Sequence, residues 1–142
     1  MIEANAPISV KSIDHVTLVV EDLERTAKFY VDLLGMRRVE RPGFNFPGLW
    51  FQAGATQIHL ILKHDGAGPA GQLGPLPSSP GRVFHFAYEV DDARAAEAIL
   101  RSAGVHVRGT GLRPDGLLQM WCYDPDGHVV ELFSRPKPVQ SA

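Results

Sequence analysis

Short apolar stretches and two helical patterns alternate along this chain. Residues 13–36, IDHVTLVVEDLERTAKFYVDLLGM, begin with a run rich in β-branched residues and continue with apolar residues at three- and four-residue steps. Such a start is typical of a packed β-strand, and the later spacing is typical of an amphipathic helix. The segment therefore predicts a strand and then a helix that ends at Gly35, because glycine adopts left-handed backbone at little cost.

The same pattern returns in the second half of the chain. The stretch GRVFHFAYEV, residues 81–90, is predicted to be a strand with His85 at its centre, and a helical pattern follows it. His15 and His85 are 70 positions apart, and so are Asp22 and Asp92. Each aspartate directly precedes a helical pattern and is expected to act as its N-cap. We infer that the chain contains an internal repeat.

Further strand-like stretches follow each helical pattern. They are expected at residues 37–41, 49–53, 56–63, 105–108, 117–123 and 129–134. Each half is therefore βαβββ, and the prediction is an α+β fold of two tandem modules, at about 12–63 and 82–134, within one domain spanning 1–142. Residues 64–81 are crowded with Gly, Pro and Ser and predict a linker, part of which could lie over a site.

Composition narrows the functional classes. Fourteen basic and sixteen acidic side chains give a net charge of −2, which does not favour a nucleic-acid partner. No apolar stretch approaches the roughly 20 residues that a membrane span requires, and the first residues do not resemble a signal peptide. The lone Cys122 excludes an intrachain disulfide. These features predict a cytoplasmic protein with no membrane partner.

Potential metal ligands occupy corresponding places in the two halves. His15 and His85 lie on the first strand of each half, and His59 and Glu131 lie on the last strands, QIHLIL and HVVELF. A carboxylate flanked by apolar residues is costly to bury unless it is paired or binds a metal. Three histidines and one glutamate are ligand types for a first-row divalent metal. The four residues therefore predict a metal site, provided that the two modules face one cleft.

The turn DPDGH, residues 124–128, predicts a hairpin with a three-residue loop and glycine in the left-handed position. This loop places Tyr123 opposite Val129 and Trp121 opposite Glu131. Because residues two apart share a face of a strand, one face is expected to carry the following side chains: Gln119, Trp121, Tyr123, Glu131 and Phe133. The opposite, helix-covered face is expected to carry Cys122 as a core thiol.

The segments IDHVTLVVEDLERTAKFYVDLLGM, QIHLIL, VFHFAYEVDD and YDPDGHVVELF resemble the glyoxalase / bleomycin-resistance / extradiol-dioxygenase superfamily, also called vicinal oxygen chelate proteins. The resemblance covers residues 12–134. It implies an incomplete barrel of two βαβββ modules around a central cleft, with a divalent metal (Zn, Ni, Co, Mn or Fe) held by His15, His59, His85 and Glu131. It also implies a substrate with neighbouring oxygens and a homodimer.

The leading hypothesis is a metal-dependent lyase or isomerase of glyoxalase type. Glu131 is the expected proton carrier and His59 the alternative. The substrate pocket is expected to be lined by Gln57, Gln119, Trp121 and Phe133. The resemblance to glutathione-dependent glyoxalase I is incomplete, because His59 stands where that enzyme has a carboxylate and Val19 stands where it has an arginine.

Other activities within the resemblance stay open. Methylmalonyl-CoA epimerases have a neutral ligand at the place of His59. A triad of His15, His85 and Glu131 would suit an extradiol dioxygenase, and His15-Val16-Thr17 resembles a motif of fosfomycin-resistance thiol transferases. A non-catalytic protein that sequesters a small molecule is the remaining alternative. The other histidines, His64, His106 and His128, are expected to be solvated or structural. An anionic substrate is one alternative for Arg82, Arg108 and Arg113, but scattered arginines of this kind are expected to lie in solvent.

Overall fold

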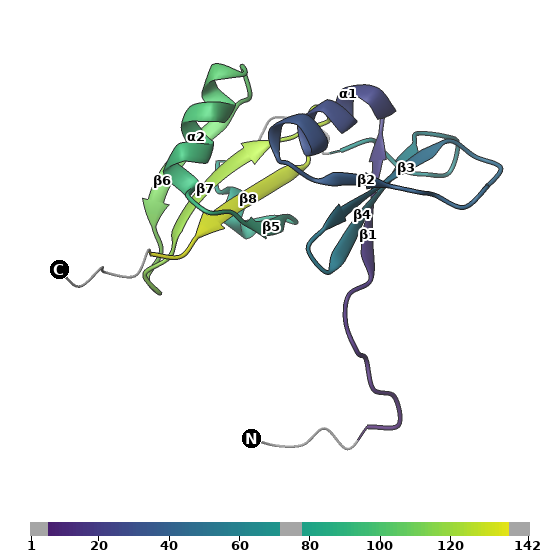
Figure 1. Ribbon diagram of the computed structural model, residues 1–142, viewed down its shortest axis with the longest axis horizontal. Helices are drawn as coiled ribbons and strands as arrows, with labels where there is room; N and C mark the ends of the chain where they lie inside the picture. Colours follow the sequence, from purple (N-terminus) through teal and green to yellow (C-terminus); the bar gives the residue numbers. More distant parts are fainter. Residues whose placement is uncertain (1–5, 72–77, 137–142) are drawn as a thin grey trace.

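The computed structural model of the protein describes residues 6–71 and 78–136, and these residues form two four-stranded mixed sheets (Figure 1). The first half contains β1 (His15–Val20), α1 (Leu23–Ala27), a π-helical turn (Lys28–Leu33), β2 (Arg37–Val39), β3 (Gly48–Ala53) and β4 (Thr56–Leu62). The second half contains a 3₁₀ turn (Pro80–Arg82), β5 (Phe86–Glu89), α2 (Ala93–Ser102), β6 (Val107–Leu112), β7 (Leu118–Tyr123) and β8 (Val129–Ser134). The predicted α+β fold of two βαβββ units is confirmed.

The two sheets have the same topology. Their strand orders are β1-β4-β3-β2 and β5-β8-β7-β6, with the first strand of each unit parallel to the last. In each unit the first strand therefore lies at an edge of its sheet. The sheets do not close into a barrel, and Figure 1 shows α1 lying between them.

The predicted helix caps are present. The Asp22 carboxylate accepts a hydrogen bond from the Arg25 amide at 3.0 Å. Asp92 accepts from the amides of Arg94 and Ala95. Capping is a local interaction between residues two or three positions apart, which is why the sequence pattern was sufficient to predict it.

The first helix differs from the expected regular helix. After Ala27 it widens into a π-helical turn, in which the Leu34 amide donates to the Phe29 carbonyl at 3.0 Å. The wider turn places the neighbouring residues Phe29 and Tyr30 both in the core, at 4% and 0% exposure. Gly35 then ends the helix with a φ of 77°, as predicted.

The strand predicted across residues 81–90 is wrong at its beginning. β5 starts only at Phe86, so His85 precedes the strand rather than lying at its centre. An edge strand has a single partner, and β8 begins at Val129, one residue before the Phe86–Val130 pair. The ladder therefore ends there. β6 also differs, because it runs over Val107–Leu112 with a register shift between Arg108 and Gly111 instead of over 105–108.

One hydrophobic core joins the two units. It contains Leu18 and Phe51 from the first unit and Leu100, Met120 and Leu132 from the second. Within the described residues 6–71 and 78–136, no helix is both long and apolar enough to cross a membrane. Residues 72–77 of the expected linker lie outside the described residues.

Candidate metal and substrate site

Each sheet presents one face to the helices and core and leaves the other face open to a site. In β4, Ile58 and Leu60 point into the core, so His59 points to the opposite face. In β8, Val130 and Leu132 are core residues, and Glu131 points away from them. Both polar side chains are nevertheless largely covered, which gives their polar atoms a strong need for partners.

His15 and His59 lie together on the open face of the first sheet. Their rings stack at 4.0 Å between centroids with an angle of 13° between planes. Trp50, which is paired with His59 across β3 and β4, stacks on His59 at 3.9 Å. His59 is therefore held between a histidine and a tryptophan, and its ring orientation is fixed by packing.

In His15 and His85, a hydrogen bond at one ring nitrogen leaves the other nitrogen with a lone pair that can bind a metal. The Nδ1 of His15 lies 2.8 Å from an oxygen of Asp14, and the Nδ1 of His85 lies 2.7 Å from the carbonyl oxygen of Val83. A carboxylate or a carbonyl only accepts, so each Nδ1 carries the hydrogen. The lone pair is then on Nε2, as is common for histidines whose second nitrogen binds a metal.

A chain of amide hydrogen bonds sets the opposite tautomer at His59. Gln52 Nε2 donates to the carbonyl of Gly54 at 2.7 Å, and Gln57 Nε2 donates to Gln52 Oε1 at 3.0 Å. Gln57 Oε1 is therefore left to accept from His59 Nε2, at 2.8 Å. The lone pair of His59 is then on Nδ1. Gln57, predicted to line the pocket, contacts this histidine directly.

Burial lowers the pKa of His59, with further lowering by the nearby charges of His15 and Arg41 and an opposing effect of Asp14. His59 is therefore the neutral base form at pH 7, which is the form that can donate an electron pair to a metal.

The second unit carries the other two predicted ligands, with Glu131 on β8 and His85 just before β5. His85 meets the edge of Trp121 at 4.8 Å, and Trp121 is paired with Glu131 across β7 and β8, as predicted. Arg113 Nη1 lies 3.6 Å from Glu131 Oε2. The expectation that Arg113 is a solvated arginine is therefore wrong, because it neighbours a carboxylate that is only 6% exposed.

The other residues predicted to line the pocket share one face of the β7–β8 hairpin. Gln119 is paired with Phe133 and Trp121 with Glu131, so all four side chains are on the open face of β7 and β8. The turn has the predicted form, because Gly127 has a φ of 87° and its amide donates to the Asp124 carbonyl. Cys122 lies in the core, as expected.

The structure places the four predicted ligands on both units: the rings of His15 and His59 stack on the first sheet, Glu131 lies on β8, and His85 lies just before β5. Across residues 6–71 and 78–136, the single group of three or more potential ligands with atoms within 4.8 Å of one another is Asp124, Asp126 and His128. His15, His59, His85 and Glu131 therefore do not meet at one point within the described part of this chain.

The acidic turn that does gather three potential ligands is already occupied by protein hydrogen bonds. Asp124 accepts from Tyr30 Oη at 2.8 Å and from His128 Nδ1 at 2.7 Å. Asp126 accepts from Arg25 Nη2 at 3.0 Å and from the Thr26 hydroxyl at 3.3 Å. These bonds attach the β7–β8 turn to α1, so the cluster is a junction between the two units. The prediction of a structural role fits the position of His128.

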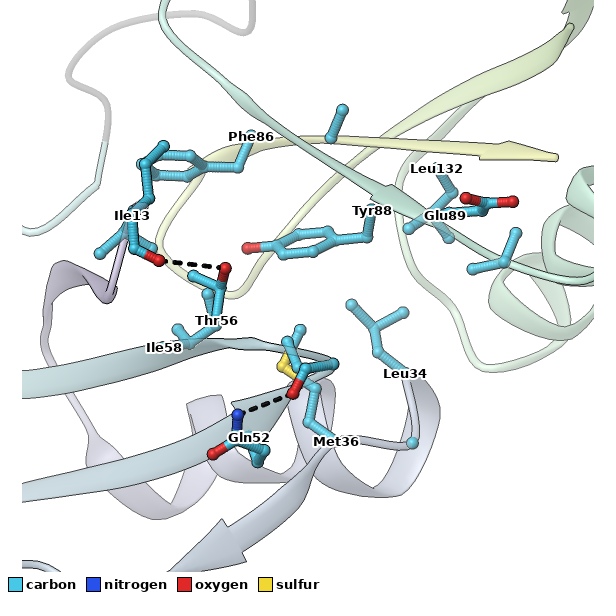
Figure 2. A pocket seen from close by; sticks show the side chains of 16 residues that line it. Ile13, Leu34, Met36, Gln52, Thr56, Ile58, Phe86, Tyr88, Glu89 and Leu132 are labelled. Atoms are coloured by element: carbon cyan, nitrogen blue, oxygen red, sulfur yellow. Dashed lines mark hydrogen bonds between the residues drawn. The ribbon is translucent and has the colours of Figure 1, made fainter. Parts of the chain in front are cut away.

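Cavities of different chemistry flank these elements. One, of about 540 Å³, lies between the units and is lined mainly by apolar side chains; Figure 2 shows Tyr88 and Thr56 pointing into it. Among the described residues, no histidine lines it. A smaller cavity, of about 240 Å³, contains His85. Another, of about 720 Å³, lies on the open face of the first sheet and contains His15, His59 and Trp50. This last cavity therefore contains two of the four predicted ligands.

Sequence reasoning missed part of that cavity. Arg41, Phe44, Phe46 and Trp50 line it beside the histidines. The first three belong to the segment RPGFNFPG, 41–48, whose Gly and Pro residues indicate a loop between short strands. Nothing in the local sequence indicates that this loop folds toward His59. Only the pairing of β3 with β4 places it there.

Comparison with known proteins identifies the family. The sequence model of the Glyoxalase/Bleomycin resistance protein/Dioxygenase superfamily matches residues 12–132. The chain is 32% identical over 103 residues to an ethylmalonyl-CoA/methylmalonyl-CoA epimerase of Cereibacter sphaeroides, covering 70% of this chain and 75% of the epimerase. It is 30% identical over 127 residues to a lactoylglutathione lyase of Haemophilus influenzae, covering 84% of this chain and 89% of the lyase.

A solved structure shares the fold. A member of the same superfamily from Sphaerobacter thermophilus aligns with a TM-score of 0.70 at 22% identity, covering 89% of this chain and 98% of its own. The fold, with two βαβββ units that leave an open face on each sheet, defines the vicinal oxygen chelate class. The chain belongs to the Glyoxalase/Bleomycin resistance protein/Dioxygenase superfamily.

Proposed function

We propose that this protein is a metal-dependent lyase or isomerase of glyoxalase type. Its substrate is a small molecule with two neighbouring oxygens, and the protein acts in the cytoplasm. The observation that carries the proposal is the matching pair of ligand types in each unit: His15 with His59 and His85 with Glu131. The similarity to an ethylmalonyl-CoA/methylmalonyl-CoA epimerase and to a lactoylglutathione lyase supports a proton-transfer reaction.

The donor set fits a divalent cation. Three imidazole nitrogens and one carboxylate suit Zn, Ni, Co, Mn or Fe rather than Ca or Mg. The lone pairs of His15 and His85 are on Nε2 and that of His59 is on Nδ1, so each ring offers one nitrogen for coordination. When bound, the cation supplies Lewis-acid polarisation of substrate oxygens.

The protein's own residues have distinct roles in this proposal. Glu131 accepts a proton from the hydroxyl-bearing carbon next to a substrate carbonyl and returns it to the carbonyl carbon. The hydroxyl proton passes to the former carbonyl oxygen, so that the hydroxyl and the carbonyl exchange places. Arg113, 3.6 Å away, compensates the charge of Glu131. His59, a neutral base, is the alternative proton carrier. General acid–base catalysis of this kind contributes about 10²–10⁴-fold to rate.

The pocket walls come from both units. Gln57 orients His59 through the 2.8 Å hydrogen bond, and Gln119, Trp121 and Phe133 form a wall on the face that carries Glu131. Their mixture of apolar and amide groups suits a small organic substrate with a few polar atoms.

A homodimer completes the site in this proposal. The outer edges of β1 and β5 are unpaired in the described part of the chain, and each ends a sheet beside one ligand pair. The exposed apolar residues Ile13 and Phe84 each stand two positions before one of these strands. Such edges favour pairing with another chain. In a twofold-symmetric dimer, the first unit of each copy meets the second unit of its partner, and two four-ligand sites form.

Metal analysis of protein purified without a histidine tag tests the ligand set. We expect about one divalent metal per chain and its loss in His85→Ala, whereas His106→Ala, which removes an exposed histidine, should retain it. Metal content below about 0.3 per chain in the unsubstituted protein would contradict the proposal and favour a non-catalytic binding protein. With metal present, oxygen consumption on catechols would contradict a lyase and favour a dioxygenase.

Mixed dimers test the arrangement. One chain carries His15→Ala with His59→Ala, and the other carries His85→Ala with Glu131→Ala. If each site combines units of two chains, a mixed dimer contains one intact site of its two, and the mixed dimer purified after co-expression holds about half of the metal content. If no metal returns although mixed dimers form, the site lies within one chain.

A further inference from the structure

The cavity on the open face of the first sheet contains an arginine that has no anionic partner. Arg41 follows β2 and lines this cavity together with His15 and His59. Its Nε is buried and has no hydrogen-bond partner. Within residues 6–71 and 78–136 its guanidinium also makes no ion pair. The other described arginines without an ion pair are exposed, whereas Arg41 is half-buried: Arg37, Arg82, Arg94 and Arg108.

Aromatic rings hold this guanidinium in place. Its central carbon lies 4.9 Å from the ring centroid of Phe44 and 4.8 Å from that of Phe46. The two rings stack on each other at 5.4 Å, and Phe44 also meets Trp50 at 6.1 Å. Cation–π contacts fix the position of a charge without neutralising it. Arg41 is therefore oriented and still positively charged.

The neighbouring strand makes room for the side chain. A Cβ at Gly48 would lie 2.9 Å from both Nε and Nη2 of Arg41 and 2.6 Å from the Leu60 carbonyl oxygen. A larger residue at this position would require Arg41 or the β4 backbone to move. Gly48 thus allows Arg41 to lie across the beginning of β3.

A partly desolvated cation without an internal counter-charge is costly unless a ligand provides one. A planar guanidinium matches the two oxygens of a carboxylate or phosphate and can bind them with two hydrogen bonds. Phe44, Phe46 and Trp50 provide apolar surface on the same side of the cavity. The cavity volume of about 720 Å³ accommodates a small organic molecule.

We propose that the substrate carries an anionic group, a carboxylate or a phosphate, which Arg41 binds, and a planar apolar part that packs on Phe44, Phe46 and Trp50. This assignment of a substrate class rests on the proposed function. The oxygen pair of the substrate then lies toward His15 and His59, which line the same cavity. Arg41 is the specificity-determining residue of this site.

Binding to the full chain in the presence of EDTA tests the assignment, because no metal then contributes positive charge. The probes are phenylacetate, its neutral analogue phenylacetamide, and phenyl phosphate, with dissociation constants measured by NMR titration. We expect the anions to bind at least about tenfold more tightly than the amide. The stronger of the two anions identifies the source of the negative charge.

Arg41→Gln should weaken binding of the preferred anion by about tenfold and change amide binding by less than about twofold. Arg41→Lys keeps the charge and should retain part of the affinity, which controls for loss of folding. Arg37→Gln, an exposed arginine on β2 outside the cavity, is the matched control and should behave like the unsubstituted protein.

Equal binding of phenylacetate and phenylacetamide, or an unchanged anion affinity in Arg41→Gln, would overturn the assignment. These outcomes are independent of the metal. If metal analysis fails but Arg41-dependent anion binding persists, the proposed catalysis is wrong and the anion site stands. If metal binds but the Arg41 dependence is absent, the substrate class alone is wrong.

Discussion

Cys122 is a residue whose thiol reactivity is determined by its position in the core. Burial, followed by the nearby charge of Asp124, raises the pKa of this thiol to about 12. At pH 8 the thiolate is then roughly a thousandfold less abundant than for a free cysteine. We predict that Ellman's reagent labels the folded protein negligibly within an hour and labels the urea-unfolded protein at once. Rapid labelling of the folded protein would place Cys122 outside the core.

Glu97 makes a local contribution to folding stability that is lost in acid. Hydrogen bonds from Thr110 and from Arg101 lower the pKa of its carboxyl from 4.5 to about 2. Because the folded-state pKa is depressed, the stabilisation is fully present above about pH 4.5 and is lost as the pH falls toward about 2.

The acid limb of the stability curve checks this expectation. Glu97→Gln should lower the melting temperature at pH 7, and its difference from the unsubstituted protein should shrink between pH 4.5 and pH 2. Glu89→Gln removes an exposed ion pair with Arg135 and should have little effect at any pH. A constant difference between the Glu97 variant and the unsubstituted protein across this range would contradict the prediction.

At the scale of elements, the contact between the first helical segment and the β7–β8 turn joins the two units. Tyr30 is fully buried and donates to Asp124 at 2.8 Å across 94 positions of the sequence. Tyr30→Phe removes the hydroxyl and leaves the ring, so Asp124 loses one of its partners. We predict a loss of about 1–3 kcal/mol in the free energy of unfolding, measured by urea denaturation with an unchanged m value.

A surface ion pair between β2 and α1 provides the comparison. Arg38→Gln breaks the exposed pair of Arg38 with Glu24 and should cost less than about 0.5 kcal/mol. Equal losses in the free energy of unfolding for the two substitutions would show that the junction between the units stabilises the fold no more than a surface ion pair.

At the scale of the whole molecule, the shared core makes the two units interdependent. We propose that the chain forms one domain, since core residues of both sheets pack in one cluster and the turn of one unit is bonded to the helix of the other. Each unit contains one tryptophan, Trp50 or Trp121, which gives separate fluorescence reports. In the variants Trp50→Phe and Trp121→Phe, fluorescence and far-ultraviolet circular dichroism should give the same unfolding midpoint. Separate midpoints within one variant would mean that the units unfold independently.

The local features of the fold could be predicted from the sequence because neighbouring residues determine them. The caps at Asp22 and Asp92, the helix end at Gly35 and the register of the β7–β8 hairpin each depend on residues within one turn of one another. The open face that carries Glu131 followed from this register. The beginning of β5 could not be predicted, because an edge strand ends where its partner ends and that partner lies 44 positions later.

The sequence by itself therefore determined the repeat, the element order, the family resemblance and the four candidate ligands, because these depend on residue type and spacing. The tertiary structure alone decided what surrounds those ligands. It placed Arg113 beside Glu131, Trp50 on His59 and Arg41 in the cavity with His15. It also left the four ligands without a common meeting point in the described part of the chain. Contacts of this kind depend on how sheets pair and pack, and packing joins residues that no spacing along the chain relates.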